Sequence, residues 1–133
     1  MKNLLFTLAA MLLALVSCQK DGNSFKASDI IGEWKATKIE ATLNSGKVLT
    51  ITDKEDLQYE LGELYWFIVT EDTVSPVNYN GNIQYPYEIS DNYIVFTGAE
   101  TGATYKVESV SRNELVIRYY ASWTSLVYYK RMN

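Results

Sequence analysis

The side chains that could perform chemistry in this chain are tyrosines, carboxylates and one cysteine. The 133 residues include 11 Tyr, 16 Asp and Glu, a single Cys and no His. Without an imidazole there is no Ser–His–Asp or Cys–His catalytic centre, and zinc sites that combine His with Cys are excluded. A single thiol cannot form a disulfide within the chain. The sequence also lacks a paired-carboxylate motif, so we expect neither an enzyme nor a bound cofactor or metal.

Cys18 follows a segment that is typical of an export signal. Lys2 provides a positive start, and residues 4–16 are apolar apart from Thr7. This run is shorter than the ~20 residues of a membrane-spanning helix, but it fits the apolar core of a secretory signal. The Leu-Val-Ser-Cys stretch that ends at Cys18 resembles a bacterial lipobox, in which the cysteine is lipidated. The alternatives are an ordinary secretory signal with a chance cysteine, or a buried core helix.

These features divide the chain into three predicted parts. Residues 1–17 are a lipoprotein signal peptide, residues 18–28 are the lipidated Cys18 and a flexible linker, and residues 29–133 are one folded domain. Several acyl chains together would hold this domain on a membrane. The expected localisation is therefore the cell envelope, as an outer-membrane lipoprotein.

The charges bear on the partners and on the orientation in the envelope. A net charge of -4 argues against nucleic acid as a partner, because its phosphates would be repelled. The residues at 18–21, Cys-Gln-Lys-Asp, partly resemble the surface-export signal of Bacteroidota-type lipoproteins. Only one acidic residue follows Lys20 in this stretch, so surface-exposed and periplasm-facing orientations both stay open.

The rest of the chain has the pattern of short strands separated by turns. Turn signals are present at Asn44-Ser45-Gly46 and at Asn80-Gly81, because Asn and Gly tolerate positive φ. Short strands at regular spacing are typical of an all-β sandwich or barrel. Pro76 and Pro86 lack the N–H that a strand ladder needs, so we expect their strands at an open seam or an irregularity. The predicted strands cover residues 30–43, 48–51, 64–70, 74–79, 83–89, 93–97, 103–110, 114–121 and 124–130.

One short helix is expected between Thr52 and Gly62. Thr52 and Glu55 have the spacing of a capping box, and Gly62 is placed to end the helix. The acidic residues within 53–56 suit the positive start of a helix. A cation site at this cluster is the alternative interpretation, but the cluster lacks the alternating ligand spacing of a calcium loop.

Alternation of apolar and polar residues indicates which strand side chains face inward. Within residues 85–89, 105–108 and 115–119 the odd-numbered positions are apolar or aromatic, and most of the even-numbered ones are polar. Tyrosines combine a flat apolar surface with a hydroxyl group, so the inward ones could line a ligand site. Packing in a filled barrel is the alternative role. The candidate ligand-binding residues are Tyr85, Tyr87, Tyr105 and Tyr119.

Gly32-Glu33-Trp34 resembles the Gly-x-Trp motif of lipocalins. In that family the Trp closes the narrow end of an eight-stranded barrel, and a basic residue near the end of the last strand packs over it. Here Arg131, or alternatively Lys130, would take that place. A cation over an indole face is a favourable arrangement. A plain core aromatic is the alternative role for Trp34.

The chain from Ile30 to Arg131 is similar to the lipocalin-like lipoproteins of Bacteroidota. Those proteins open with Ile/Leu-Ile/Leu-Gly-x-Trp and end with Tyr-Tyr-x-(Lys)-Arg, and both patterns are present here. The resemblance implies an all-β fold, a lipocalin-like antiparallel up-and-down β-barrel of about eight strands with one short helix. The domain is shorter than a typical lipocalin, so the cavity should be small. No ligand residues can be carried over from the family.

We therefore expect a lipoprotein that binds a small apolar ligand in the barrel. The site should lie at the end away from Trp34, because that residue blocks its own end. The ligand should be largely apolar, because no inward cluster of Lys or Arg is evident. The alternative is a cell-envelope interaction module that binds a protein or glycan partner through its surface, with residues 74–87 as the candidate region.

Overall fold

The computed structural model describes residues 19–21, 25–77, 83–98, 103–120 and 124–132 of the chain. The predicted signal peptide and Cys18 lie outside these residues, as does the predicted turn at Asn80-Gly81. No helix of the described part is long and apolar enough to span a bilayer.

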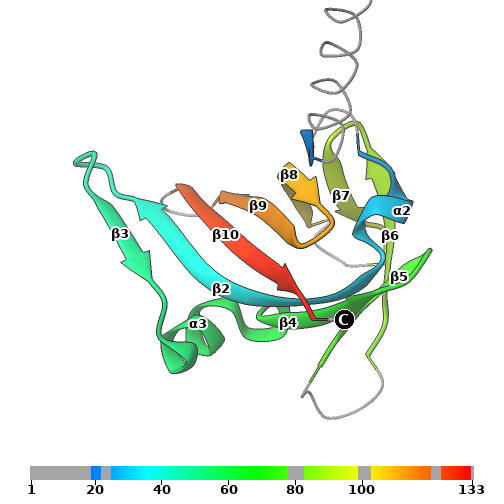
Figure 1. The fold of residues 1–133 in the computed structure, drawn as a ribbon, viewed down its shortest axis with the longest axis horizontal. Helices are drawn as coiled ribbons and strands as arrows, with labels where there is room; N and C mark the ends of the chain where they lie inside the picture. The colour runs from blue at the N-terminus through cyan, green and yellow to red at the C-terminus, as the bar shows by residue number, and fades with distance from the viewer. Residues whose placement is uncertain (1–18, 22–24, 78–82, 99–102, 121–123, 133) are drawn as a thin grey trace, which may run out of the picture.

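The described chain is mainly strands, joined in one antiparallel network (Figure 1). Eight of them, β2 and β4 to β10, form a closed barrel, because each pairs with the next along the chain and β10 returns to β2. The predicted fold class, an eight-stranded up-and-down barrel, is confirmed. The strands are β1 (Gln19–Asp21), β2 (Gly32–Thr42), β3 (Val48–Ile51), β4 (Trp66–Val69), β5 (Thr73–Pro76), β6 (Tyr85–Ser90), β7 (Tyr93–Phe96), β8 (Thr104–Ser111), β9 (Glu114–Tyr120) and β10 (Thr124–Arg131).

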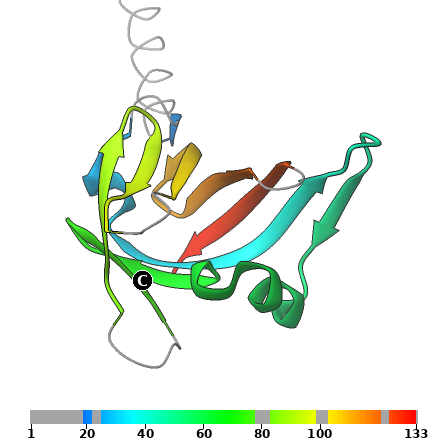
Figure 2. The same cartoon turned by 180° about the vertical axis from the view of Figure 1, so that it is seen from behind.

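Strand β2 pairs with β10 along one edge and is long enough to pair with two strands along the other. Residues Gly32–Lys35 pair with β4 inside the barrel, and residues Ile39–Thr42 pair with β3. The β2–β3 hairpin therefore extends beyond the barrel wall, as the back view shows (Figure 2). A bulge at Thr37 shifts the register against β10. The shift lets Trp34 and Ile39 both be buried, although they are five residues apart.

The helix between β3 and β4 is α3 (Lys54–Leu61), which ends at Gly62 with a φ of 54° as predicted. The predicted Thr52 cap is wrong. Asp53 is the N-cap, and its carboxylate accepts hydrogen bonds from the backbone N–H groups of Glu55 and Asp56. An aspartate at this position satisfies two of the free N–H groups and carries the charge that a helix start favours. This capping also accounts for the acidic cluster.

Two short helical segments were not predicted from the sequence. The first, α2 (Ala27–Ile30), begins within residues expected to be linker, and Phe25 before it is buried. The second is the 3-10 turn η1 (Gly62–Leu64), which connects α3 to β4. Both segments lie at barrel ends, outside the strands, where the alternation of apolar and polar residues does not predict the local structure.

One of the two prolines, Pro86, lies where two neighbouring strands of the barrel pair over the shortest stretch. Strands β5 and β6 pair through only two residue pairs, Thr73 with Pro86 and Val74 with Tyr85. This is the shortest ladder in the described part of the barrel wall. Pro86 lies in this short ladder, which agrees with its lack of a ladder N–H, whereas Pro76 pairs with Phe67 of β4 without a register shift.

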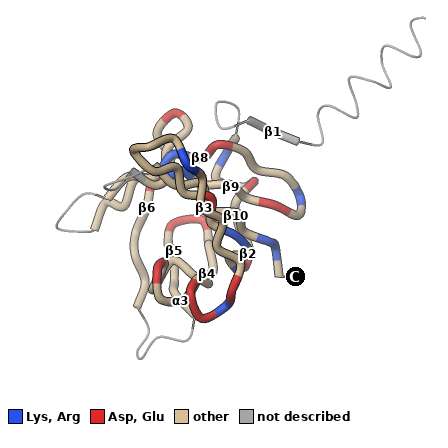
Figure 3. The backbone as a smooth tube through the Cα atoms, turned by 90° about the vertical axis from the view of Figure 1, so that its left-hand side faces the viewer, with Lys and Arg blue, Asp and Glu red and all other residues tan. Residues whose placement is uncertain are grey.

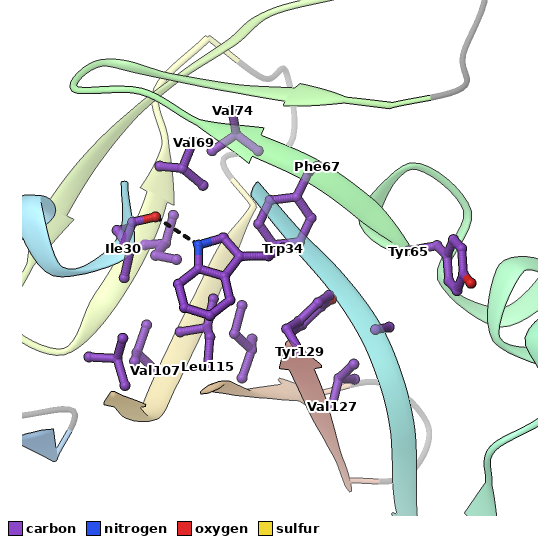
Figure 4. Close-up of a cluster of buried hydrophobic side chains, with 14 of the residues drawn as sticks. Ile30, Trp34, Tyr65, Phe67, Val69, Val74, Val107, Leu115, Val127 and Tyr129 are labelled. Atoms are coloured by element: carbon purple, nitrogen blue, oxygen red, sulfur yellow. Dashed lines mark hydrogen bonds between the residues drawn. The ribbon is translucent and has the colours of Figure 1, made fainter. Parts of the chain in front are cut away.

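Trp34 lies at the centre of one barrel end, within a cluster of apolar side chains (Figure 4). It is fully buried, and its indole N–H donates to the carbonyl oxygen of Ile30 at 2.8 Å. The guanidinium carbon of Arg131 lies 4.2 Å from the centre of the indole ring. Arg131 also donates to the backbone carbonyls of Asp29, Ile31 and Arg112. The basic residue over Trp34 is thus Arg131, and this end of the barrel is closed.

Candidate functional site

A pocket of about 180 Å³ lies at the barrel end opposite Trp34. Antiparallel pairing brings together the start of β6, the end of β7 and the start of β8, and the turn η1 lies beside them. Three aromatic rings, two small or aliphatic side chains and one carboxylate form the lining. These residues are Glu63, Leu64, Tyr85, Phe96, Ala103 and Tyr105.

The aromatic residues form a continuous row around this end of the barrel. The ring centres of Tyr85 and Phe96 are 6.2 Å apart, and those of Phe96 and Tyr105 are 5.8 Å apart. Tyr119 follows at 4.8 Å from Tyr105. Neighbouring rings stand edge to face, with interplanar angles of 81°, 79° and 67°. Edge-to-face pairs are favoured by the ring quadrupoles, so the row is a stable wall.

Glu63 is the only charged residue in the described pocket lining. Its Oε2 atom accepts a hydrogen bond from the Tyr85 hydroxyl at 2.7 Å. This bond is the main reason that the pKa of Tyr85 is raised, because it favours the neutral phenol. Sequence analysis missed Glu63, since it lies on a 3-10 turn where the strand alternation gives no information.

A pair of hydrogen-bonded tyrosines connects the pocket wall to the barrel core. The Tyr129 hydroxyl donates to the carbonyl oxygen of Leu64 at 2.7 Å, and it lies 2.7 Å from the Tyr119 hydroxyl. Because Tyr129 has only one hydroxyl proton, Tyr119 must be the donor in the second bond. Burial raises the pKa of both tyrosines well above the ordinary value. Both hydroxyls therefore stay protonated at neutral pH and can hold Leu64 in place.

Replacing Tyr129 by Phe should lower the free energy of unfolding by about 1–3 kcal/mol. The change removes the donor to Leu64 and leaves a buried carbonyl without that partner. Chemical denaturation followed by tryptophan fluorescence measures the loss. Tyr59→Phe is the control, because Tyr59 is 86% exposed and should change stability very little. Equal stability of Tyr129→Phe and the wild type would contradict the assigned role of this bond.

The four predicted tyrosines separate into two groups. Tyr85 and Tyr105 line the pocket, and Tyr119 packs against Tyr105 one position deeper. Tyr87 lies away from the pocket, because β6 runs from the open end toward the closed one. Its hydroxyl donates to the carbonyl oxygen of Thr70 at 2.6 Å, beside the β4–β5 turn. Alternation predicts the face of a strand, but it does not say which end of the barrel a residue is near.

The barrel interior below the pocket is filled. The void between the central side chains measures about 10 Å³, which is at most the room for one water molecule. The void is lined by Ile30, which contacts Trp34, by Tyr105, which also lines the pocket, and by Tyr119, which packs against Tyr105. Any ligand of the barrel must therefore bind near the open end.

Known proteins provide no further indication of function. No protein-family model, curated protein or solved structure matches the chain. Within the described ranges, no three Cys, Asp or Glu side chains are grouped so that they could hold a metal ion.

Proposed function

We propose that the protein is a lipocalin-like lipoprotein of the outer membrane that binds one small, largely apolar ligand at the open end of its barrel. The pocket opposite Trp34 is the observation that carries this proposal. It is concave, its walls are mainly apolar and aromatic, and a few polar groups could orient a ligand, which is typical of small-molecule sites. The lipobox-like residues before Cys18 support the membrane anchor.

The volume of the pocket limits the size of the ligand. Drug-sized ligands occupy cavities of about 300–1,000 Å³, and this pocket measures about 180 Å³. An apolar cavity of about 150 Å³ is large enough to bind benzene. The proposed ligand is therefore no larger than a single ring or a short branched chain. The hydroxyl of Tyr85 and the carboxylate of Glu63 could each make one hydrogen bond to it.

Filling the pocket should abolish ligand binding without unfolding the barrel. Ala103 lines the pocket and is half-buried, so Ala103→Phe would place a ring in the space that the ligand needs. We expect at least a tenfold loss of affinity, which is about 1.4 kcal/mol. Titrating small probes such as phenol and toluene into the full-length protein, with ligand-observed NMR as the readout, measures this loss.

Thr50→Phe is the matched control, because it adds the same ring on the exposed strand β3, away from the pocket. Binding should be unchanged in this variant. If the wild type binds none of the small probes, or if both variants bind equally well, the pocket is not the ligand site.

The alternative function is an envelope interaction module. Exposed apolar side chains favour it: Val48 and Leu49 on β3 are 51% and 40% exposed. The region expected for this role, residues 74–87, is less suited to bind a partner at the surface. Val74 and Tyr87 are buried, and Tyr85 lines the pocket. Native mass spectrometry of the protein from its host distinguishes the two functions, since it would reveal either a small molecule or a protein bound to it.

A further inference from the structure

We infer that the ligand of this pocket is a small organic cation, with a compact ammonium group held between Glu63 and the rings of Tyr85, Phe96 and Tyr105. The inference rests on the proposed function, and it names the chemical class of the ligand. The sequence predicts only a largely apolar ligand, and Glu63 adds the charge preference.

The described lining of the pocket carries one negative charge and no positive one. Glu63 contributes a carboxylate, and none of the described lining residues is Lys or Arg. The neutral Tyr85 hydroxyl that donates to Oε2 does not neutralise the carboxylate, so its negative charge can be paired with a cationic ligand, whether or not that ligand carries an N–H. An anionic ligand would be repelled at this point, and a neutral apolar one would take up none of the charge. An organic cation can pair with the carboxylate and can also contact the aromatic rings of the lining.

Three aromatic rings stand next to one another in the wall of the pocket. Tyr85 and Tyr105 each stand nearly perpendicular to Phe96 between them, at 81° and 79°. All three rings line the pocket, so a compact group bound there would contact aromatic surface on more than one side. The face of an aromatic ring is negative and attracts a cation that lies within about 6 Å of its centre. The hydrogen bond from Tyr85 to a carboxylate makes that ring more electron-rich.

The electrostatic potential around the pocket is also set by a cluster of acidic residues. Residues 53–63, which include α3 and lead into η1, carry five acidic side chains and one lysine. Figure 3 shows acidic residues gathered along α3, and Glu63 at the end of this stretch lines the pocket. Helix α3 also ends next to the pocket, so its carbonyl groups place partial negative charge there. The basic residues of neighbouring strands are engaged elsewhere. Lys35 lies over Trp66, and Lys106 pairs with Glu108. The local potential therefore attracts cations.

Three probes of the same shape and different charge test the inference. Choline is the cation, 3,3-dimethylbutan-1-ol is its neutral counterpart, and 3,3-dimethylbutanoate is an anion of similar size. Each is titrated into the full-length protein with ligand-observed NMR as the readout. We expect choline to bind about tenfold more tightly than the neutral alcohol, and the anion to bind most weakly.

Three variants assign the preference to Glu63. Glu63→Gln should reduce the ratio of the two affinities to about one while the alcohol still binds. Glu88→Gln removes the same charge from an exposed position of β6 that is neither in the pocket lining nor in the acidic stretch 53–63, and it should keep the tenfold ratio. Tyr85→Phe breaks the hydrogen bond to Glu63 but retains the carboxylate and the ring, so it should keep most of the preference for choline.

Results that differ from these expectations would contradict either the ligand class, the binding site or the role of Glu63. If the alcohol binds as tightly as choline, the ligand class is wrong, whereas the proposed small-molecule site stands. If neither probe binds, both proposals fail. If Ala103→Phe still binds choline, the cation binds outside the pocket and the inference fails. If Tyr85→Phe loses the preference as fully as Glu63→Gln, then Glu63 only positions Tyr85 and is not the counter-charge.

Discussion

Trp34→Ala should lower the free energy of unfolding by about 3–5 kcal/mol, the range for removing a buried aromatic side chain. The indole is fully buried and is the largest such side chain in the described core. The change would also remove the hydrogen bond to the Ile30 carbonyl and the ring beneath Arg131. Chemical denaturation measures the loss, with circular dichroism as the readout because the variant lacks one fluorescent residue.

Trp66→Ala is the matched control for this prediction. Trp66 is half-buried on the outer face of β4, where its indole N–H donates to Glu33 and Lys35 lies over its ring. Its removal leaves no cavity inside the barrel, so the loss should be clearly smaller. A loss below about 1 kcal/mol for Trp34→Ala, the size of an average substitution, would contradict its role in closing the barrel.

Cys18→Ala should abolish lipid attachment. In cells grown with a labelled fatty acid, the wild-type protein should carry the label and the variant should carry none. Loss of several acyl chains removes stable membrane binding, so the variant should also leave the outer-membrane fraction. The melting temperature of the domain should not change, because the substitution alters none of the buried residues of the described core.

Ser17→Ala is the control for lipidation, because it keeps a small residue before Cys18 and changes no other part of the signal. It should still be labelled and should stay in the outer-membrane fraction. A wild-type protein that never takes up the labelled fatty acid would overturn the proposed anchor. The pocket and the barrel do not depend on that result.

Strand positions were predictable from the sequence because alternation and turn chemistry are local properties. The turn after β2 illustrates this: Gly46 has a φ of 87°, a conformation that glycine adopts without strain. The expected strand at residues 30–43 is β2 at Gly32–Thr42, and the expected helix ends at Gly62. The N-cap of that helix was predicted at Thr52, but it is Asp53. The two residues are adjacent, and the side chain of either one can accept hydrogen bonds at a helix start.

Alternation also identified the inward side of most strands, but bulges limited it. In β8 the register shifts between Val107 and Ser109. As a result Val107 and Val110 are both buried, although a strict period of two would put them on opposite faces. Such a shift depends on the partner strand, which the local sequence does not specify. The same applies to Thr37 in β2.

The sequence by itself determined that this protein is a set of short strands with Trp34 and Arg131 at their two ends. Only the tertiary structure decided that Arg131 lies over Trp34, that Tyr87 lies away from the pocket, and that Glu63 joins Tyr85. Each of these facts depends on residues far apart in the chain. Barrel closure sets them, because the pairing of β10 with β2 determines which strand ends meet. Periodicity reports the face of a strand, whereas a binding site requires the position of that face relative to all others.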